Sequence, residues 1–554
     1  MLRLPENFQK DAASIIGLLV LIGALFHALP SGYWRADDPA LLWHAMNSKG
    51  LQAFYNPANW QKLSVNNLTP WLTFSFKLDL WLAGLSPKFF YLHALGSLAL
   101  VSVAAYVLNR LWLSPLWATL SVGLFLSGAP TASVTELLMT RHYLEGLLFA
   151  LLSVIAFVLA ARQQRLSWAI AGSIAYALAC SAKEIYVPLV LVLLLLPPIG
   201  HLKTRLKLIA PYLMVAMLYV FWRKYMLGVM VGGYADTQSI FSMQSVSGMV
   251  TAVSHFPAYV FGSHWVVPSL ACGVALTVAA YKKPRAIPAF CALALGVFLP
   301  LVPLIAFPGI AGPDRYLFLF WFVASFACVL SIHTAVAVID RKNIQRISGA
   351  CLCLLLISFS VVHTLEVQKT NEAMYREFDV QGRFYFESDR HQAVSPTALL
   401  LHGFWYVTNL CDIKKHLSLD CPATLIKGVP TQESIEHLFA YDSTKGAMLE
   451  VPLDTPNPIG GIVSIDTSRS LRAAISVERG EGRWRLGPYD AGQYYFASPL
   501  IGRYAVAKNG VLKTPLTHLA FYVQYESPEG WATSSPLLTA GVGQPVTWER
   551  AGPQ

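Results

Sequence analysis

The stretch AASIIGLLVLIGALFHALPSGYWRADDP, residues 12–39, joins a hydrophobic segment directly to two adjacent carboxylates. Its apolar part, Ala12 to Leu29, is long enough to cross a bilayer as a helix. Asp37 and Asp38 therefore lie just outside a membrane helix, at the water interface. Because carboxylates are costly next to hydrocarbon, a pair at this position indicates a functional site.

The composition of the whole chain is that of an integral membrane protein. Of its 554 residues, 55% are hydrophobic and only 13% are charged, whereas soluble domains carry about a quarter charged residues. The formal net charge of +10 does not indicate nucleic acid, because cations that flank membrane spans on the cytoplasmic side raise the charge by themselves. We expect membrane lipids, and no nucleic acid, as partners.

Apolar segments predict about eleven transmembrane helices, since roughly 20 such residues cross a bilayer. They are 12–29, 89–109, 114–130, 143–161, 166–182, 184–198, 208–227, 256–280, 287–306, 316–338 and 347–364. Basic clusters, from Arg3 and Lys10 to Arg341, Lys342 and Arg346, recur in alternate loops, which places the N-terminus in the cytoplasm. With an odd number of spans, the chain after residue 364 lies outside.

Two domains follow from this topology. Residues 1–364 form an α-helical polytopic membrane domain, and residues 365–554 form an extracytoplasmic domain. Alternating runs such as Ala473–Val477 and Leu519–Val523 favour strands, hence an α/β or β-rich fold for the second domain. We expect a bacterial inner membrane with the site in the periplasm, although an endoplasmic reticulum membrane gives the same topology.

The cysteines differ by location. Most of them lie in apolar segments and are typical of small core residues. Cys411 and Cys421 lie in the polar C-terminal part, where we expect them to face an oxidising compartment and form a disulfide. Two free thiols are the alternative.

Ionisable residues that interrupt the apolar pattern gather on the outer side of the predicted membrane. Besides Asp37 and Asp38 they are Glu136, Arg141, His142, Lys183, Glu184, Arg223, Lys224, Asp314 and Arg315. A site for an anionic lipid headgroup would have this distribution. Sugar transfer from a polyprenyl phosphate needs an acid to take the acceptor proton, cations to stabilise the departing phosphate, and an apolar groove for the tail.

The residues can be given roles in such a reaction. Asp37 and Asp38 can supply the base, and because adjacent acids repel, we expect one of them to have a raised pKa. The candidate phosphate ligands, among which Arg can bond two oxygens at once, are Arg141, Lys183, Arg223, Lys224 and Arg315. The candidate supporting residues are Glu136, His142, Glu184, Asp314 and Tyr316. A divalent metal at Asp37 and Asp38 is compatible with this chemistry, but the sequence does not demand one.

Each cluster also has a structural interpretation. Asp37 and Asp38 precede Pro39 and can cap a helix that starts near Ala40. Lys183-Glu184 and Asp314-Arg315 can be structural ion pairs, and Arg223-Lys224 can extend to lipid headgroups. The placement of all these clusters on one side of the membrane favours the functional interpretation more than any single motif does.

Several motifs, in order, resemble the GT-C superfamily of lipid-carrier-dependent glycosyltransferases. The resemblance covers about residues 12–340 and is closest to the protein O-mannosyltransferase-like branch that includes the transmembrane and tetratricopeptide-repeat-containing proteins. The matching stretches are Ala36-Asp37-Asp38-Pro39, Asn67 to Phe74 followed by Leu85 to His93, Ala129-Pro130 with Glu136 and Arg141, Ala182-Lys183-Glu184, and Asp314-Arg315-Tyr316-Leu317. Thr69 stands where Arg is common, and the repeats are absent.

This resemblance implies a GT-C-like fold and a polyprenyl-phosphate sugar as donor. It also implies inversion by direct displacement, with the first-loop acid as general base; we place that role on Asp37, with Asp38 as second choice. The acceptor, a protein, glycan or lipid, stays open. A transporter or flippase of lipid-linked sugars is an alternative, although it would need ionisable groups near the midplane. A non-enzymatic envelope glycan assembly protein is another.

Overall fold

The computed structural model describes residues 8–196, 202–230, 254, 256–282, 313–337, 339, 341–389, 391–395, 403–421, 423–424, 436–442, 445–451, 466, 468–478, 481–498, 502–513, 518–536, 538–541 and 543–552. The chain divides into two compact units, Met1–Tyr375 and Arg376–Gln554. The predicted boundary after residue 364 falls within α19 (Lys342–Glu387). No proline interrupts this helix, so the predicted span 347–364 and the charged segment after it form one continuous element.

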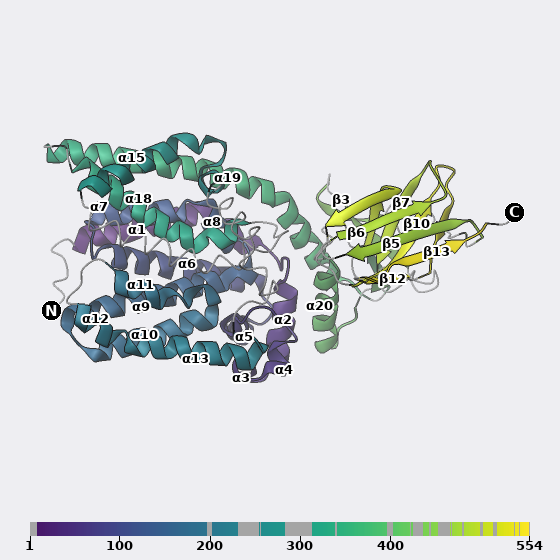
Figure 1. Cartoon of the computed structure of the whole chain (residues 1–554), viewed down its shortest axis with the longest axis horizontal. Helices are drawn as coiled ribbons and strands as arrows, with labels where there is room; N and C mark the ends of the chain where they lie inside the picture. The colour runs from purple at the N-terminus through teal and green to yellow at the C-terminus, as the bar shows by residue number, and fades with distance from the viewer. Residues whose placement is uncertain are drawn as a thin grey trace. The chain divides into compact units, whose positions relative to one another are not determined.

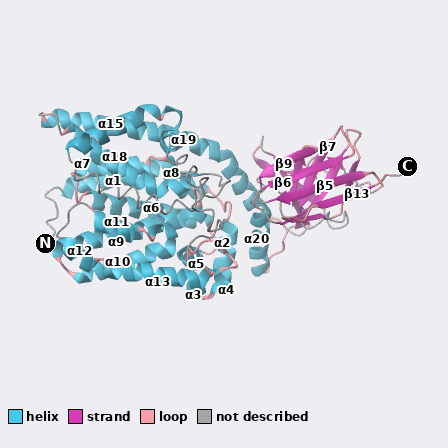
Figure 2. Ribbon diagram, viewed as in Figure 1, coloured by secondary structure: helices cyan, strands magenta, loops and turns pink. Residues whose placement is uncertain are grey.

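The first unit is helical, as the cyan ribbons of Figure 2 show. Its elements are α1 (Phe8–Phe26), η1 (Leu29–Ser31), α2 (Asp38–Asn47), α3 (Gln52–Tyr55), α4 (Pro57–Trp60), α5 (Pro70–Ala83), α6 (Pro87–Asn109), α7 (Pro115–Leu126), α8 (Ala129–Thr135), η2 (Leu138–Thr140), α9 (Arg141–Gln163), α10 (Leu166–Ala182), η3 (Glu184–Tyr186), α11 (Leu189–Leu195), α12 (Leu202–Leu208), α13 (Ala210–Leu227), η4 (Gly262–His264), α15 (Val266–Lys282), η6 (Pro313–Leu317), α18 (Phe318–Val336) and the start of α19. Proline opens α5, α6 and α7, where its missing N–H costs nothing.

Five helices among the described residues are long and apolar enough to cross a membrane. They are Phe8–Phe26, Pro87–Asn109, Leu138–Gln163, Arg315–Val336 and Lys342–Glu387. Every predicted span overlaps a helix except 287–306, which lies outside the described residues. Together with the composition, these helices make the chain an integral membrane protein, while the total of about eleven spans stays a prediction.

Helix α9 lies inside the bundle and positions the residues discussed below. It packs against α6 and α10, while α18 packs against α7 and α15 (Figure 1). A Cβ on Gly146 of α9 would lie 2.3 Å from the Tyr186 ring, so only glycine allows this approach. The Tyr186 hydroxyl donates to the Tyr143 carbonyl at 2.7 Å. These contacts fix the Lys183 turn beside the first turn of α9.

The second unit is rich in strands, as expected. Its elements are β1 (Gln392–Ser395), α20 (Gly403–His416), β2 (Ala423–Thr424), β3 (His437–Asp442), β4 (Ala447–Val451), β5 (Leu471–Glu478), β6 (Glu481–Gly487), β7 (Gln493–Ser498), β8 (Gly502–Val506), β9 (Asn509–Lys513), β10 (His518–Glu526), β11 (Ala532–Ser534), β12 (Leu538–Gly541) and β13 (Val546–Arg550). The runs Ala473–Val477 and Leu519–Val523 lie in β5 and β10.

Two of the sheets in this unit share one core. Their strand orders are β11-β10-β7-β8, with β12 also pairing β10, and β13-β5-β6-β9. Buried side chains of both sheets, among them Ile475, Leu486, Tyr494 and Val523, form a single hydrophobic cluster. A smaller sheet has the order β2-β1-β3-β4, and a disulfide joins Cys411 of α20 to Cys421.

Candidate functional site

A tight turn places the two acids of the first loop in different surroundings. Ala36 has a left-handed φ of 47°, and the Asp38 amide donates to the Arg35 carbonyl at 2.9 Å. Asp38 is fully buried, and its Oδ2 accepts a hydrogen bond from the Arg35 amide at 2.8 Å. Asp37 is half-buried and occupies the N-cap position of α2 without a side-chain cap hydrogen bond. Asp38 therefore holds the turn, while the Asp37 carboxylate is not used as a helix cap.

Burial separates the acids further. It raises the pKa of Asp38 to about 8, against the opposing effect of the hydrogen bond from the Arg35 amide. The neighbouring Asp37 charge also raises this pKa but is the smallest cause. A raised pKa in the pair was expected, but its main origin is desolvation rather than mutual repulsion. Near pH 7 Asp38 is mostly protonated, which suits a structural role and not that of a base.

Arg35 ties this turn to two distant parts of the chain. Its guanidinium is buried and lies 4.6 Å from the Tyr375 ring centroid and 5.4 Å from that of Tyr91. Its Nη1 donates to the Glu136 carbonyl at 3.1 Å. The Glu136 carboxyl interacts with the side chains of Gln368 and Tyr375, and its burial raises the pKa to about 7. The end of α8 and the middle of α19 thus hold the first loop in place.

Arg315 brings a second cation, Lys183, into the neighbourhood of Asp37. Lys183 follows α10, is 8% exposed, and has its Nζ 5.1 Å from the Tyr143 ring centroid. Arg315 lies in η6, half-buried, and interacts electrostatically with both Lys183 and Asp37. Within the described part of the chain Lys183 makes no ion pair. Two buried or half-buried cations side by side, with one carboxylate near them, form an environment suited to an anion.

The electrostatic state of Lys183 reflects this environment. The pKa of its ammonium group is lowered to about 8: burial is the main cause, Glu184 opposes the shift, and repulsion from Arg315 adds to it. An anion bound between the two cations would favour the protonated form. The charge of Lys183 is therefore available at neutral pH and is lost only a little above it.

Glu184 and Arg223 form a separate ion pair. The Arg223 Nε lies 3.0 Å from Glu184 Oε1, which also accepts a hydrogen bond from the Leu68 amide at 2.8 Å. Arg223 is buried and also donates to the Val229 carbonyl at 3.0 Å. The pair joins α13, η3 and the loop before α5. Its neighbour Lys224 is exposed.

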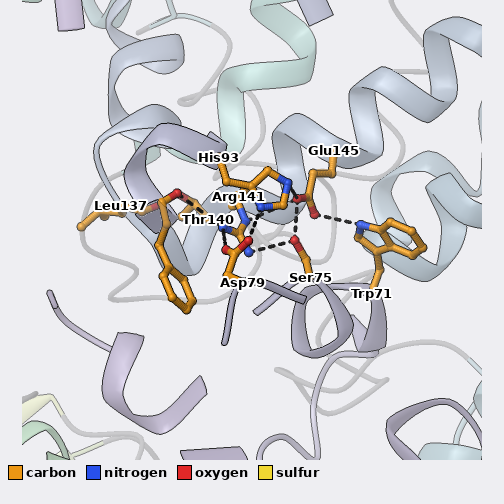
Figure 3. A network of polar contacts seen from close by, with 9 residues as sticks. Trp71, Ser75, Asp79, His93, Leu137, Thr140, Arg141 and Glu145 are labelled. Atoms are coloured by element: carbon orange, nitrogen blue, oxygen red, sulfur yellow. Dashed lines mark hydrogen bonds and ion pairs between the residues drawn. The ribbon is translucent and has the colours of Figure 1, made fainter. Parts of the chain in front are cut away.

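Arg141 belongs to a buried polar network on α5, α6 and α9, shown in Figure 3. It is fully buried, forms an ion pair with the equally buried Asp79, and places its Nε 3.3 Å from Glu145. Its Nη2 donates to the Ser75 hydroxyl at 2.8 Å. His93 bridges the two acids, with its Nδ1 2.5 Å from Asp79 and its Nε2 3.4 Å from Glu145.

This network leaves Arg141 little capacity for a ligand. Both acids and the serine engage its guanidinium, and the Phe76 ring centroid lies 4.9 Å from its central carbon. Trp71 adds a hydrogen bond from its Nε1 to Glu145 at 2.8 Å. The charge of Arg141 is thus balanced within this network, whereas Lys183 has no ion pair among the described residues; the predicted phosphate contact of Arg141 stays a prediction.

The remaining predicted residues are placed as follows. His142 is buried in the first turn of α9 and interacts electrostatically with Lys183 and Arg315. The Tyr316 hydroxyl accepts a hydrogen bond from Arg315 Nη2 at 3.1 Å. The side chain of Asp314 lies outside what the structure describes. Among the described residues no group of three or more His, Cys, Asp or Glu side chains could hold a metal ion.

An apolar groove begins next to the cations. Its lining includes Ile185 and Tyr186, which follow Lys183 in the chain, and Leu319 and Phe322, which follow Arg315. On the α9 side it is lined by residues from Leu147 to Val154, and its far end reaches Trp112 and Leu196. Counted together with the open solvent at its surface, the space between its atoms is about 890 Å³. A long hydrocarbon chain fits this chemistry.

Sequence reasoning did not select Arg35, Tyr375, Asp79, His93 or Glu145 as site residues. Glu145 stands four positions after Arg141, a spacing that places the two on one helix face, and this signal was available. Arg35 lies in the quoted stretch itself. For Tyr375, Asp79 and His93 no local pattern could have shown the contact, because their partners come from other helices.

Comparisons with known proteins give limited similarity. No protein-family model and no curated protein sequence matches the chain. The chain is similar to the oligosaccharyltransferase of Archaeoglobus fulgidus in complex with Zn and sulfate (12% identity, 89% of this chain and 72% of that chain covered, TM-score 0.45). It is also similar to Archaeoglobus fulgidus AglB in complex with an inhibitory peptide and a dolichol-phosphate (9% identity, 90% of this chain and 74% of that chain covered, TM-score 0.46). A third similar structure is ArnT from Cupriavidus metallidurans bound to undecaprenyl phosphate (12% identity, 78% of this chain and 93% of that chain covered, TM-score 0.42). Similarity at this level does not transfer chemistry between chains.

Proposed function

We propose that this chain is a membrane glycosyltransferase of the GT-C type, which transfers a sugar from a polyprenyl-phosphate donor to an extracytoplasmic acceptor. The proposal is carried by one observation: Arg315 lies within electrostatic reach of both Lys183 and Asp37, and an apolar groove is lined by residues that closely follow the two cations in the chain. These groups come from three separate parts of the sequence. An acid, an anion site and a hydrocarbon site are the three elements that the reaction needs.

The groups take the following roles. The polyprenyl tail lies in the groove lined by Ile185 and Leu319, and the phosphate lies against Lys183 and Arg315. Asp37 accepts the proton of the acceptor hydroxyl as its oxygen forms a bond to the anomeric carbon. The bond between that carbon and the phosphate oxygen breaks, and the polyprenyl phosphate keeps the electron pair. The two cations stabilise the charge that develops on it. A single displacement inverts the anomeric centre.

Lys183 offers a direct test of the donor site. Lys183→Met keeps the length of the side chain and removes a buried charge, so we expect the variant to fold. Because a hydrogen bond to a charged group contributes roughly 1.5–3 kcal/mol, affinity for undecaprenyl phosphate should fall about 10- to 100-fold. Binding can be measured by native mass spectrometry of the purified protein in nanodiscs.

Lys224→Met is the matched control for this experiment. Lys224 is an exposed lysine in the last turn of α13. We expect the Lys224→Met variant to bind undecaprenyl phosphate with the same affinity as the unchanged protein. Equal losses in the two variants would mean that the lipid binds by general attraction to positive charge, which would contradict the proposed site.

The affinity for undecaprenyl phosphate should also depend on pH. The pKa of Lys183 is lowered to about 8, and only the protonated form attracts the phosphate. Affinity should therefore be constant just above pH 7 and fall as the pH rises through 8, approaching tenfold per unit, since about 1.4 kcal/mol corresponds to one pKa unit. Lys183→Arg keeps its charge throughout this range and should remove the slope. A slope that persists in this variant would assign the titration to another group.

A further inference from the structure

His142 has an unusual environment for a buried histidine. It is 6% exposed, and its ring lies beside that of Tyr143, with 4.7 Å between the centroids. Neither ring nitrogen makes a hydrogen bond with any residue that the structure describes. The Met139 backbone is close enough to the ring to interact weakly as a hydrogen-bonding group, but it lies outside the geometry of a formed hydrogen bond. Buried polar atoms without partners are destabilising, so such an arrangement needs an explanation.

His44 shows how this protein satisfies a structural histidine. It is equally buried, at 6% exposure. Its Nδ1 lies 3.1 Å from the Thr73 hydroxyl and its Nε2 lies 3.1 Å from the Asn59 carbonyl. Arg141, directly before His142 on the same helix turn, is likewise surrounded by partners. Single polar atoms elsewhere in the bundle, such as the Ser102 hydroxyl and Arg141 Nε, also lack a hydrogen-bond partner among the described residues, but His142 differs from His44 in that both of its ring nitrogens do.

The neighbours of His142 indicate what it could bind. Lys183 and Arg315 are its charged electrostatic neighbours, and a third positive charge between them would be unfavourable. A neutral imidazole carries one donor and one acceptor. A phosphate oxygen only accepts and is matched by the two cations. A sugar hydroxyl both donates and accepts, and therefore complements the imidazole.

We propose that His142 binds the sugar of the lipid-linked donor through a hydroxyl group near the phosphate, and so contributes to the choice of sugar. This inference rests on the proposed function, because it needs the phosphate to lie against Lys183 and Arg315. His142 then differs in role from the cations: they hold the part that all polyprenyl phosphates share, and His142 contacts the part that varies.

The test compares binding of undecaprenyl phosphate with that of undecaprenyl phosphates carrying glucose, mannose or galactose. We expect the unchanged protein to bind at least one conjugate more tightly than the bare carrier. His142→Ala and His142→Phe should lower the affinity for that conjugate about tenfold, as expected for a lost hydrogen bond. The affinity for the bare carrier should stay unchanged. His142→Gln keeps a donor and an acceptor and should restore part of the preference.

His44→Phe provides the control for a structural role. It removes two hydrogen bonds and should lower the unfolding temperature, whereas His142→Phe should not. Three results would overturn the inference: equal weakening of carrier and conjugate, a conjugate preference that persists without His142, or no preference in the unchanged protein. Each of these results leaves the dependence of undecaprenyl phosphate binding on Lys183 in place, whereas loss of that dependence contradicts the proposed function itself.

Discussion

Replacing Asp37 by Asn should reduce sugar transfer by about 100- to 10,000-fold, the range over which general bases contribute, without unfolding the protein. Asp37 is half-buried, makes no cap hydrogen bond with α2, and interacts electrostatically with Arg315. Asn keeps the size of the side chain but cannot accept the acceptor proton. The measurement is the release of undecaprenyl phosphate from undecaprenyl-phosphate hexoses, in the presence of an envelope extract as a source of acceptor.

Asp38→Asn is the matched control for this variant. Asp38 is fully buried with a pKa raised to about 8, so a neutral side chain of the same shape replaces an acid that is already mostly protonated near pH 7. Its amide oxygen can still accept the hydrogen bond from the Arg35 amide. We expect this variant to keep most of the transfer activity. Loss of transfer in Asp38→Asn but not in Asp37→Asn would reverse the assignment of the base.

Helices were the part of the fold that sequence could predict. A run of apolar residues without proline, such as Ala12 to Leu29, has few alternatives to a helix once it is in a membrane. The strands β5 and β10 were predicted from another local signal, the alternation of apolar and polar residues in 473–477 and 519–523. The continuous α19 was less accessible, since its middle changes from apolar to charged without any residue that stops a helix.

The site was predictable only in part. That Asp37, Lys183 and Arg315 lie on one side of the membrane followed from the parity of the spans, and the structure places them within electrostatic reach. Asp37 and Asp38 differ in burial, and therefore in their surroundings, because of how distant helices pack around them. Two neighbouring residues in a sequence give no sign of that difference. Arg141 was the hardest case, because its partner Asp79 lies on α5, far from it in the sequence and between the two motif stretches that end at Phe74 and begin at Leu85.

Arg141→Ala is therefore expected to act on stability. It would leave Asp79 and Glu145 buried without their cation, and breaking a buried ion pair in this way costs about 3–5 kcal/mol of unfolding free energy. His93 remains beside both acids but is itself 28% exposed, so it replaces the guanidinium only in part. Urea unfolding of the purified protein in detergent measures this loss.

A double replacement distinguishes a stabilising role of Arg141 in the network from a role in donor binding. In Asp79→Asn with Arg141→Met, the ion pair with Asp79 is removed as a whole and only Glu145 still lacks its cation. Part of the stability should therefore return, since one of the two uncompensated buried charges is gone. The double variant should also bind undecaprenyl phosphate, because Lys183 and Arg315 are intact. If Arg141→Ala kept its stability but lost this binding, Arg141 would be a phosphate ligand. The anion would then have to bind next to Asp79. The buried ion pair between Arg141 and Asp79 argues against such a site.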